Sequence, residues 1–189
     1  SGGAIYGDAE LMPTPETAQV RPMAAYGQSK FCAEAYCGWY ERLYGLSSVT
    51  LRYGNVYGPR QDPHGEAGVI AIFCGKVLVG ETPRIYGDGR QTRDYTYVAD
   101  IVAANLAAAS HPEAHGVYNV GTGRECSVLE VLAALRRAGN LDEDELQPEF
   151  APARLGELPR SALDVSRARA ELGFTAQADL DAGMRRTLE

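Results

Sequence analysis

Apolar positions along the chain alternate between short β-branched runs and longer segments with helical spacing. Apolar and aromatic residues recur through 25–44, and Gly45 follows at a position suited to a left-handed C-terminal residue, so we predict a helix here. The segment SVTLRY at 48–53 is short and β-branched, which is typical of a buried strand. The alternation continues to the C-terminus and predicts an α/β protein.

The remaining elements follow the same alternation. Ser127, with Glu130 three residues later, has the pattern of a capping box and predicts a helix that runs to Arg137. We further expect a strand end at 4–6, a Gly/Pro loop at 54–65, a helix at 69–79, a strand–turn–strand unit at 84–97 with its bend at 87–89, a helix at 98–109, a strand at 116–120, an acidic loop at 140–149, and helices at 166–172 and 180–188.

The composition argues against two classes of protein. The 189 residues, 45% apolar and 23% charged, suffice for one compact domain or for two lobes that share a core. No apolar run approaches the roughly 20 residues that span a bilayer, so we expect no membrane segment. The net charge of −7, without a basic stripe, argues against nucleic-acid binding.

The cysteines suggest neither a disulfide framework nor a metal site. Cys32, Cys37, Cys74 and Cys126 show no CxxC spacing, and with three scattered histidines they make no plausible metal set. We interpret all four as reduced packing residues of a cytoplasmic protein without a metal ion.

Tyr26 and Lys30 are candidates for a catalytic pair. They are four residues apart on one predicted helix, so their side chains share a face. A phenol, with a reference pKa near 10, is a poor base at neutral pH, but an ammonium about 4 Å away stabilises the phenolate by about 4 kcal/mol at an effective dielectric near 20. About 0.12 such pairs are expected by chance from 11 tyrosines and two lysines, so the spacing needs support from other motifs.

Four motifs supply that support. MAAYGQSKFCAE contains the pair, SGGAIYG precedes it, and LRYGNVYGPRQ and IYGDGRQTRDYTYVADI follow it in order. Together they resemble the extended short-chain dehydrogenases of the NAD-dependent epimerase/dehydratase family, and the resemblance runs from Ser1 to about Leu188. It implies the C-terminal part of a Rossmann-like doubly wound parallel sheet with a smaller α/β substrate-binding lobe. Residues 1–60 and 93–120 would belong to the NAD-binding domain, 61–92 and 121–175 to the nucleotide-sugar-binding lobe, and 176–189 to a C-terminal helix.

The resemblance also implies catalytic roles. Ser1 would bind the sugar hydroxyl, Tyr26 would take its proton, and Tyr26, Lys30 and Tyr53 would contact the NAD cofactor. Ser1 stands 25 residues before Tyr26, which matches the usual separation in sugar epimerases. In many relatives the catalytic hydroxyl lies four residues before a Tyr-Gly pair, and in this chain that position is Gly2. A one-residue bulge at Gly2–Gly3 would reconcile the two positions.

Three positions resemble contacts to the sugar diphosphate. Asn55 would bind the diphosphate, and Arg93 and Arg154 would hold the pyrophosphate, for which planar guanidinium forks are well suited. The alternative for either arginine is a solvated surface charge, and the motif context favours the binding role.

Three further positions resemble contacts to the rest of the substrate. Tyr86 would flank a uracil ring, and Glu157 would accept hydrogen bonds from ribose hydroxyls. Ser161 stands where a bulky residue restricts the pocket to plain hexoses, so a small residue there leaves room for an N-acetyl group.

Two motifs that the chain lacks narrow the expected activity and the expected cofactor site. Nucleotide-sugar dehydratases carry an acidic pair after the catalytic hydroxyl, whereas this chain has glycine and alanine there and no carboxylate before Asp8. No glycine-rich dinucleotide motif is found in a strand–turn–helix setting, and the Gly121–Gly123 turn is only a weak candidate for a phosphate loop. We therefore expect this chain to be a C-terminal fragment that, in isolation, does not bind NAD.

The sequence thus indicates an NAD-dependent nucleotide-sugar epimerase of the UDP-hexose 4-epimerase type, which acts by transient oxidation at C4. A reductase or another epimerase of the same superfamily, or a non-catalytic binding relative, are the alternatives, and NADP is an alternative to NAD. The resemblance also implies a homodimer through the helix that bears Tyr26. Trp39 and Tyr40 would face the partner there or, alternatively, pack in the core.

Overall fold

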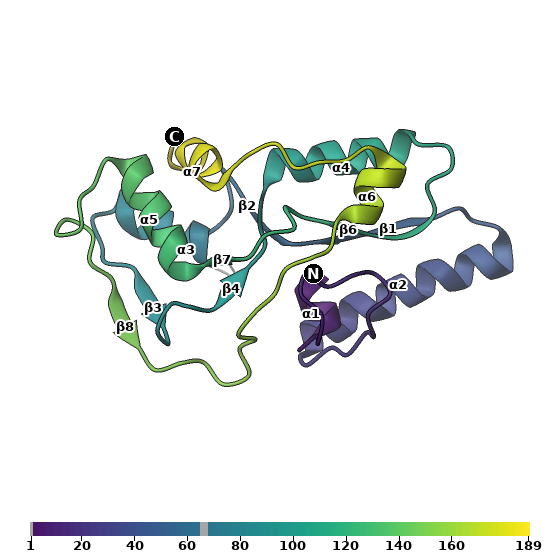
Figure 1. Cartoon of the computed structure of the whole chain (residues 1–189), viewed down its shortest axis with the longest axis horizontal. Helices are drawn as coiled ribbons and strands as arrows, with labels where there is room; N and C mark the ends of the chain where they lie inside the picture. The colour runs from purple at the N-terminus through teal and green to yellow at the C-terminus, as the bar shows by residue number, and fades with distance from the viewer. Residues whose placement is uncertain (1, 65–67) are drawn as a thin grey trace.

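The computed structural model describes residues 2–64 and 68–189 and shows an elongated chain of alternating helices and short strands (Figure 1). The helices are α1 (Gly2–Tyr6), α2 (Ala25–Tyr44), α3 (Val69–Leu78), α4 (Val98–Ser110), α5 (Val128–Gly139), α6 (Ser166–Leu172) and α7 (Leu180–Leu188). The strands are β1 (Val49–Tyr53), β2 (Asn55–Tyr57), β3 (Arg84–Tyr86), β4 (Thr92–Arg93), β5 (Tyr95–Tyr97), β6 (Gly116–Val120), β7 (Cys126–Ser127) and β8 (Glu149–Ala151).

The central feature is a strand that changes partner at Gly54. β1 pairs in parallel with β6 along its whole length, whereas β2, one residue further on, pairs in parallel with β5. At the change, the Gly54 amide donates to the Val120 carbonyl (2.8 Å) and the Asn55 amide to the Asp94 carbonyl (2.6 Å). A Cβ at Gly54 would lie only 2.6 Å from that Asp94 carbonyl oxygen, so a side chain does not fit there. The carboxyl ends of parallel strands, where α/β proteins bind their ligands, therefore meet around Asn55.

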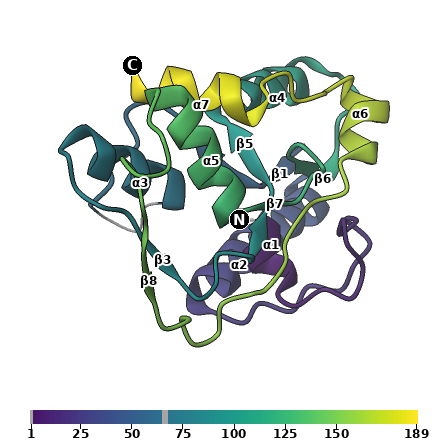
Figure 2. The same cartoon turned by 60° about the vertical axis from the view of Figure 1, so that its left-hand side comes forward.

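The strand–turn–strand unit expected at 84–97 does not form a hairpin, because its strands pair with other elements. β3 pairs in parallel with β8, β4 pairs antiparallel with β7, and β5 pairs with β2 (Figures 1 and 2). The bend at 87–89 does form, with Gly87 and Gly89 at positive φ, but it turns the chain toward other partners. The strands β2, β7 and β8 were not expected, because two or three residues are too few to show a period of two.

The first segment also differs from expectation. Residues 2–6 form a five-residue helix, not a strand end, and the helix closes with a hydrogen bond from the Gly7 amide to the Gly3 carbonyl (3.1 Å). Its side chains Ile5 and Tyr6 are buried, and Gly7 ends it at a φ of 64°. Apolar side chains in so short a segment fit either conformation, and tertiary packing decides between them.

Other expectations are confirmed. α2 ends at Gly45, which has a φ of 65° and whose amide donates to the Glu41 carbonyl. The capping box of α5 is complete, with the Ser127 amide donating to the Glu130 carboxylate (2.7 Å) and the Glu130 amide donating to the Ser127 hydroxyl (3.2 Å). The predicted α/β class is confirmed by parallel strand pairs with helices packed against them.

Two larger apolar clusters, and a small one of Tyr6, Leu163 and Val165, hold the described part of the chain together. One joins α3, α5 and α7 to β2, β3 and β5, and the other joins α4 and α6 to β1 and β6. The helix α6 thus packs with the sheet part, while α7 packs against α5. The division into a cofactor domain and a substrate lobe stays a prediction, and the clusters favour two packing units that interleave in sequence.

The surface of α2 departs from two expectations. Within α2, Gly27 alone is buried. Trp39 and Tyr40 are 41% and 44% exposed, so the alternative prediction that these two rings pack in the core is wrong. Cys32 and Cys37, on the same helix, are exposed as well, whereas Cys74 is buried and Cys126 half-buried. The interpretation of all four cysteines as packing residues therefore fails for the two on α2.

Candidate active site

Tyr26 and Lys30 lie together on one face of α2, as their spacing predicts. The Lys30 Nζ is 5.3 Å from the centre of the Tyr26 ring, and the Tyr26 side chain is 51% exposed. Both line a cavity of about 650 Å³, which is also lined by Tyr53, Asn55 and Ser161. The phenol and the ammonium are thus open to a ligand that enters this cavity.

Close contact between α1 and α2 forms one wall of this cavity. A Cβ at Gly27 would clash with the Ala4 carbonyl, so the absence of a side chain lets the two helices approach. Ser161 is 9% exposed and lies against Gly3, where a Cβ would clash with the Ser161 hydroxyl. Gly3, Tyr26 and Ser161 come from segments far apart in sequence, and all border the same space.

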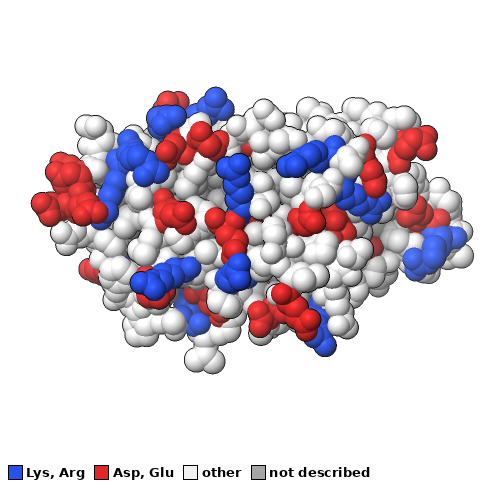
Figure 3. Space-filling model, in the orientation of Figure 1, with Lys and Arg blue, Asp and Glu red and all other residues white. Residues whose placement is uncertain are grey.

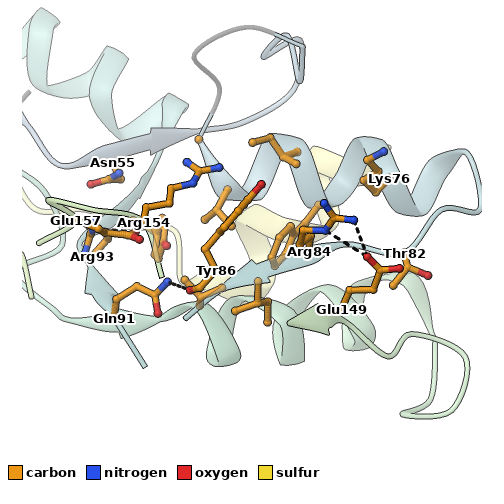
Figure 4. Close-up of a pocket in the computed structure, with 17 residues that line it drawn as sticks. Asn55, Lys76, Thr82, Arg84, Tyr86, Gln91, Arg93, Glu149, Arg154 and Glu157 are labelled. Carbon is orange, nitrogen blue, oxygen red and sulfur yellow. Dashed lines mark hydrogen bonds and ion pairs between the residues drawn. The ribbon is translucent and has the colours of Figure 1, made fainter. Parts of the chain in front are cut away.

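A second cavity of about 520 Å³ adjoins the first, and Asn55 and Arg93 line both (Figure 4). In it the Arg154 guanidinium carbon lies 4.0 Å from the centre of the Tyr86 ring, a cation–π contact. Arg154 holds the pKa of the Tyr86 phenol below its ordinary value. An aromatic face with a guanidinium beside it is a suitable surface for a heteroaromatic ring linked to phosphate.

Arg93 is held in place by its neighbours. Its Nη1 donates to the backbone carbonyls of Thr92 (2.7 Å) and Leu158 (2.8 Å), and its Nη2 donates to the Glu157 carboxylate (3.3 Å). The side chains of Arg93 and Glu157 are 17% and 30% exposed. The two residues predicted to bind pyrophosphate and ribose are therefore the two halves of one ion pair at the junction of the cavities.

The end of the second cavity away from Asn55 contains residues that the sequence reasoning missed. Gln91, also missed, lies nearer Asn55, and its side-chain amide donates to the Tyr86 carbonyl (2.8 Å). At the far end, Arg84 forms an ion pair with Glu149 across β3 and β8 (2.9 Å) (Figure 4). Lys76 also lines this end and forms an ion pair with Glu81. Arg84 could have been found, because it lies two residues before Tyr86 on a strand and so points to the same side.

The Gly121–Gly123 turn does not act as an open phosphate loop. Asp94 is 1% exposed, and its carboxylate accepts hydrogen bonds from the Thr122 amide (2.8 Å), the Thr122 hydroxyl (2.7 Å) and the Gly123 amide (3.0 Å). A Cβ at Gly121 would clash with this carboxylate. An anion of the protein itself thus occupies the position that a phosphate would need, and the weak phosphate-loop candidate is ruled out.

The structure brings the predicted residues that it describes into these two adjoining cavities. Ser1 lies outside the described residues, so its role and the choice between Ser1 and Gly2 stay predictions. The other predicted residues line one or both cavities: Tyr26, Lys30, Tyr53, Asn55, Tyr86, Arg93, Arg154, Glu157 and Ser161. Their assigned roles are taken up as proposals below.

The fold and the site together define a Rossmann-like α/β protein with two adjoining cavities beside a Tyr–Lys pair. Residues 1–121 match the model of the NAD dependent epimerase/dehydratase family, so the chain belongs to that family.

Individual relatives agree with this membership. The chain is 44% identical over 189 residues to UDP-glucose 4-epimerase from Mycolicibacterium smegmatis. The match covers 100% of this chain and 59% of that relative. It is also similar to the crystal structure of UDP-glucose 4-epimerase with UDP-glucose from Thermotoga maritima (TM-score 0.93, 43% identity) and to that of the Thermus thermophilus UDP-glucose 4-epimerase complex with NAD (TM-score 0.88, 43% identity). Each structural match covers 100% of this chain and 60% of the other.

Two further features concern the charge of the surface and the apolar character of the helices. Basic and acidic side chains are interspersed over the face shown in Figure 3. Within residues 2–64 and 68–189, no helix combines the length and the apolar character that a membrane crossing requires.

Proposed function

We propose that this chain supplies the catalytic pair and the substrate site of an NAD-dependent nucleotide-sugar epimerase of the UDP-hexose 4-epimerase type. The observation that carries the proposal is the arrangement of the two cavities. Tyr26 and Lys30 line the first cavity, Tyr86 and Arg154 line the second, and Arg93 lines both. This order matches a sugar, a diphosphate and a base along one extended ligand.

In this proposal Tyr26 acts as the general base. Its phenolate would take the proton from the C4 hydroxyl of the sugar, and the same phenol would return a proton after the ketone has turned over in the site. Bound NAD supplies the chemistry of hydride acceptance from C4 and hydride return to the opposite face. Lys30, whose Nζ lies 5.3 Å from the centre of the Tyr26 ring, would supply the cation beside the phenol.

The described residues fit one end of the cofactor. Tyr26, Lys30 and Tyr53 border the first cavity and would hold the nicotinamide and its ribose. The glycine-rich turn at 121–123 offers no pyrophosphate site, because Asp94 fills it. We therefore propose that these 189 residues alone do not bind NAD tightly. Calorimetric titration of the chain with NAD tests this, and micromolar affinity would contradict it.

The small Ser161 side chain supports a broader substrate range. Gly3 and Ser161 are already in contact, so a larger side chain at 161 would have to extend into the first cavity. We propose that the cavity accepts both hexose and N-acetylhexosamine nucleotides. Ser161→Tyr should lower kcat/KM for UDP-N-acetylglucosamine by about 100-fold, as expected for a steric clash, with little effect on UDP-glucose.

The exposed aromatic face of α2 supports a homodimer. Tyr36, Trp39, Tyr40 and Tyr44 form a cluster with ring centroids 4.8–6.5 Å apart, all on the surface of the chain. Burial of these rings against a second copy would remove a large apolar area from water. Sedimentation of the full-length protein and of its Trp39→Glu variant tests this, since the variant should be monomeric. We place the protein in the cytoplasm, where its thiols would stay reduced.

The main experiment measures interconversion of UDP-galactose and UDP-glucose by the full-length protein that contains this chain. We expect turnover by the unsubstituted protein and a loss of about 100-fold or more in kcat for Tyr26→Phe. Tyr36→Phe, an exposed tyrosine of the same helix, is the matched control and should retain kcat. Absence of turnover with these sugars and with their N-acetyl forms would favour the non-catalytic alternative.

A further inference from the structure

A buried ion pair connects the helix of the catalytic pair to the sheet. Arg52 on β1 donates from Nε to Glu34 Oε2 (2.9 Å) and from Nη2 to Glu34 Oε1 (2.5 Å), a bidentate arrangement. The side chains are 4% and 13% exposed, which makes this the most buried ion pair among the described residues. Removal of one partner from such a pair leaves a buried charge without compensation and is strongly unfavourable.

The same guanidinium also holds α1. Arg52 Nη1 donates to the Tyr6 hydroxyl (2.6 Å), and that hydroxyl donates to Asn119 Oδ1 on β6 (2.9 Å). Tyr6 and Asn119 are 1% and 0% exposed, and the Arg52 guanidinium carbon lies 4.8 Å from the centre of the Tyr6 ring. Burial lowers the pKa of Arg52, but its bonds with Glu34 and Tyr6 outweigh burial and raise it above its ordinary value. One side chain thus joins α1, α2, β1 and β6, and both helices border the first cavity.

The position of Glu34 on α2 gives this pair a second consequence. Glu34 follows Lys30 by four residues and Tyr26 by eight, so all three lie along one face of the helix. α2 also packs closely against α1, where Gly27 meets the Ala4 carbonyl without contributing a side chain. Among the described residues, the bonds between Glu34 and Arg52 join a side chain of α2 to the sheet, so this pair is suited to restrain rotation of the helix about its axis.

We propose that Glu34 and Arg52 are positioning residues for the reaction, because they set the rotation of α2 and with it the place of Tyr26 and Lys30 in the cavity. This rests on the function proposed above. A rotation of about 10° displaces a phenolic oxygen some 8 Å from the helix axis by about 1.4 Å. A displacement of about 1 Å in a reacting group costs about 100-fold in rate. The binding residues of the second cavity lie on other elements and would keep their places.

The experiment compares Glu34→Gln with Glu41→Gln in the full-length protein with its cofactor. Glu41 lies two turns further along α2 and has no ion pair within the part of the chain that the structure describes. For Glu34→Gln we expect kcat to fall by about 10- to 100-fold while KM for the UDP-sugar changes less than about threefold. The dependence of kcat on pH should change as well, because the phenol and the ammonium no longer lie where the reaction needs them. Glu41→Gln should match the unsubstituted protein in all three.

The outcomes separate positioning from stability. If folded Glu34→Gln has a lower Tm but an unchanged kcat and pH profile, the pair is only structural and the proposal is wrong. If Glu34→Gln does not fold, Arg52→Lys gives the same decision, since it keeps the charge and loses the bidentate fork. A normal kcat for folded Arg52→Lys would likewise overturn the proposal. Failure of the unsubstituted protein to turn over UDP-sugars would instead contradict the function proposed above.

Discussion

Substitution of Asp94 by asparagine tests how the two halves of the site are joined. The Asp94 carboxylate binds the turn after β6 through Thr122 and Gly123, and it also accepts from the Leu163 amide (3.4 Å). Its backbone carbonyl accepts from the Asn55 amide at the point where the strand changes partner. Asparagine has almost the same shape, so the substitution changes hydrogen bonding and charge without leaving a cavity.

The expected cost follows from the two carboxylate oxygens. Oδ1 accepts from the amide and hydroxyl of Thr122, and Oδ2 accepts from the amides of Gly123 and Leu163. Asparagine can replace only one oxygen's function. With its NH₂ group at the Oδ1 position, the Thr122 hydroxyl can rotate to accept from it, so the bond from the Thr122 amide is the one that is lost. Loss of one charge-assisted bond costs about 1.5–3 kcal/mol, and the unpaired buried donor costs about 1–3 kcal/mol more. We expect the free energy of unfolding to fall by about 3–5 kcal/mol, and Tm by roughly 6–12 °C or more for a chain of this size.

The assay is equilibrium unfolding in urea, followed by circular dichroism, for the unsubstituted protein, Asp94→Asn and Asp88→Asn. Asp88 is the matched control, because its side chain is exposed and accepts one hydrogen bond, from the Arg90 amide. Its substitution should change the free energy of unfolding by less than about 0.5 kcal/mol. A loss below about 1 kcal/mol for Asp94→Asn would refute the reasoning, since the buried carboxylate would then not hold the turn.

Three further predictions concern other parts of the site. Lys30→Met should lower kcat by about 100-fold in the epimerase assay, whereas Arg42→Met, in the last turn of the same helix, should leave kcat unchanged. Arg154→Leu should raise KM for UDP-sugars at least about tenfold with a smaller effect on kcat, as measured by steady-state kinetics, because it contacts the ligand away from the reacting carbon. Arg160 lowers the pKa of Glu125 from 4.5 to about 2, so this contribution to stability is present above pH 4.5 and is lost as the pH falls toward 2. Tm measured between pH 5.5 and 2.5 should therefore fall less steeply in Arg160→Gln than in the unsubstituted protein, and equal slopes would contradict the assignment.

The sequence was most informative where the determinants are local. The cap of α5 at Ser127, the end of α2 at Gly45 and the common face of Tyr26 and Lys30 each depend on residues within about four positions, and all three are found as expected. The motif resemblance likewise identified residues that the fold brings into two adjoining cavities, although nothing in their spacing along the chain shows that they meet.

The sequence was least informative where partners are far apart. β3 pairs with β8, which lies more than 60 residues further on, so the local turn at 87–89 suggested the wrong neighbour. The bonds of Arg93 to Glu157 and of Arg52 to Glu34 and Tyr6 depend equally on tertiary structure. The helical form of residues 2–6 was missed for the same reason, because its packing against distant segments decides a conformation that five residues cannot.

Under the proposed function, the ion pair between Arg93 and Glu157 bears on how the site discriminates among anions. The carboxylate is an internal competitor, already seated on the guanidinium at the junction of the two cavities. A free phosphate ion would have to weaken that pair and would gain little else in return. A nucleotide-sugar could compensate through simultaneous contacts at both ends of the cleft, while Glu157 turned to its ribose hydroxyls. Such a site would bind the complete ligand with higher affinity than its fragments, and inorganic phosphate in the cell would not block it.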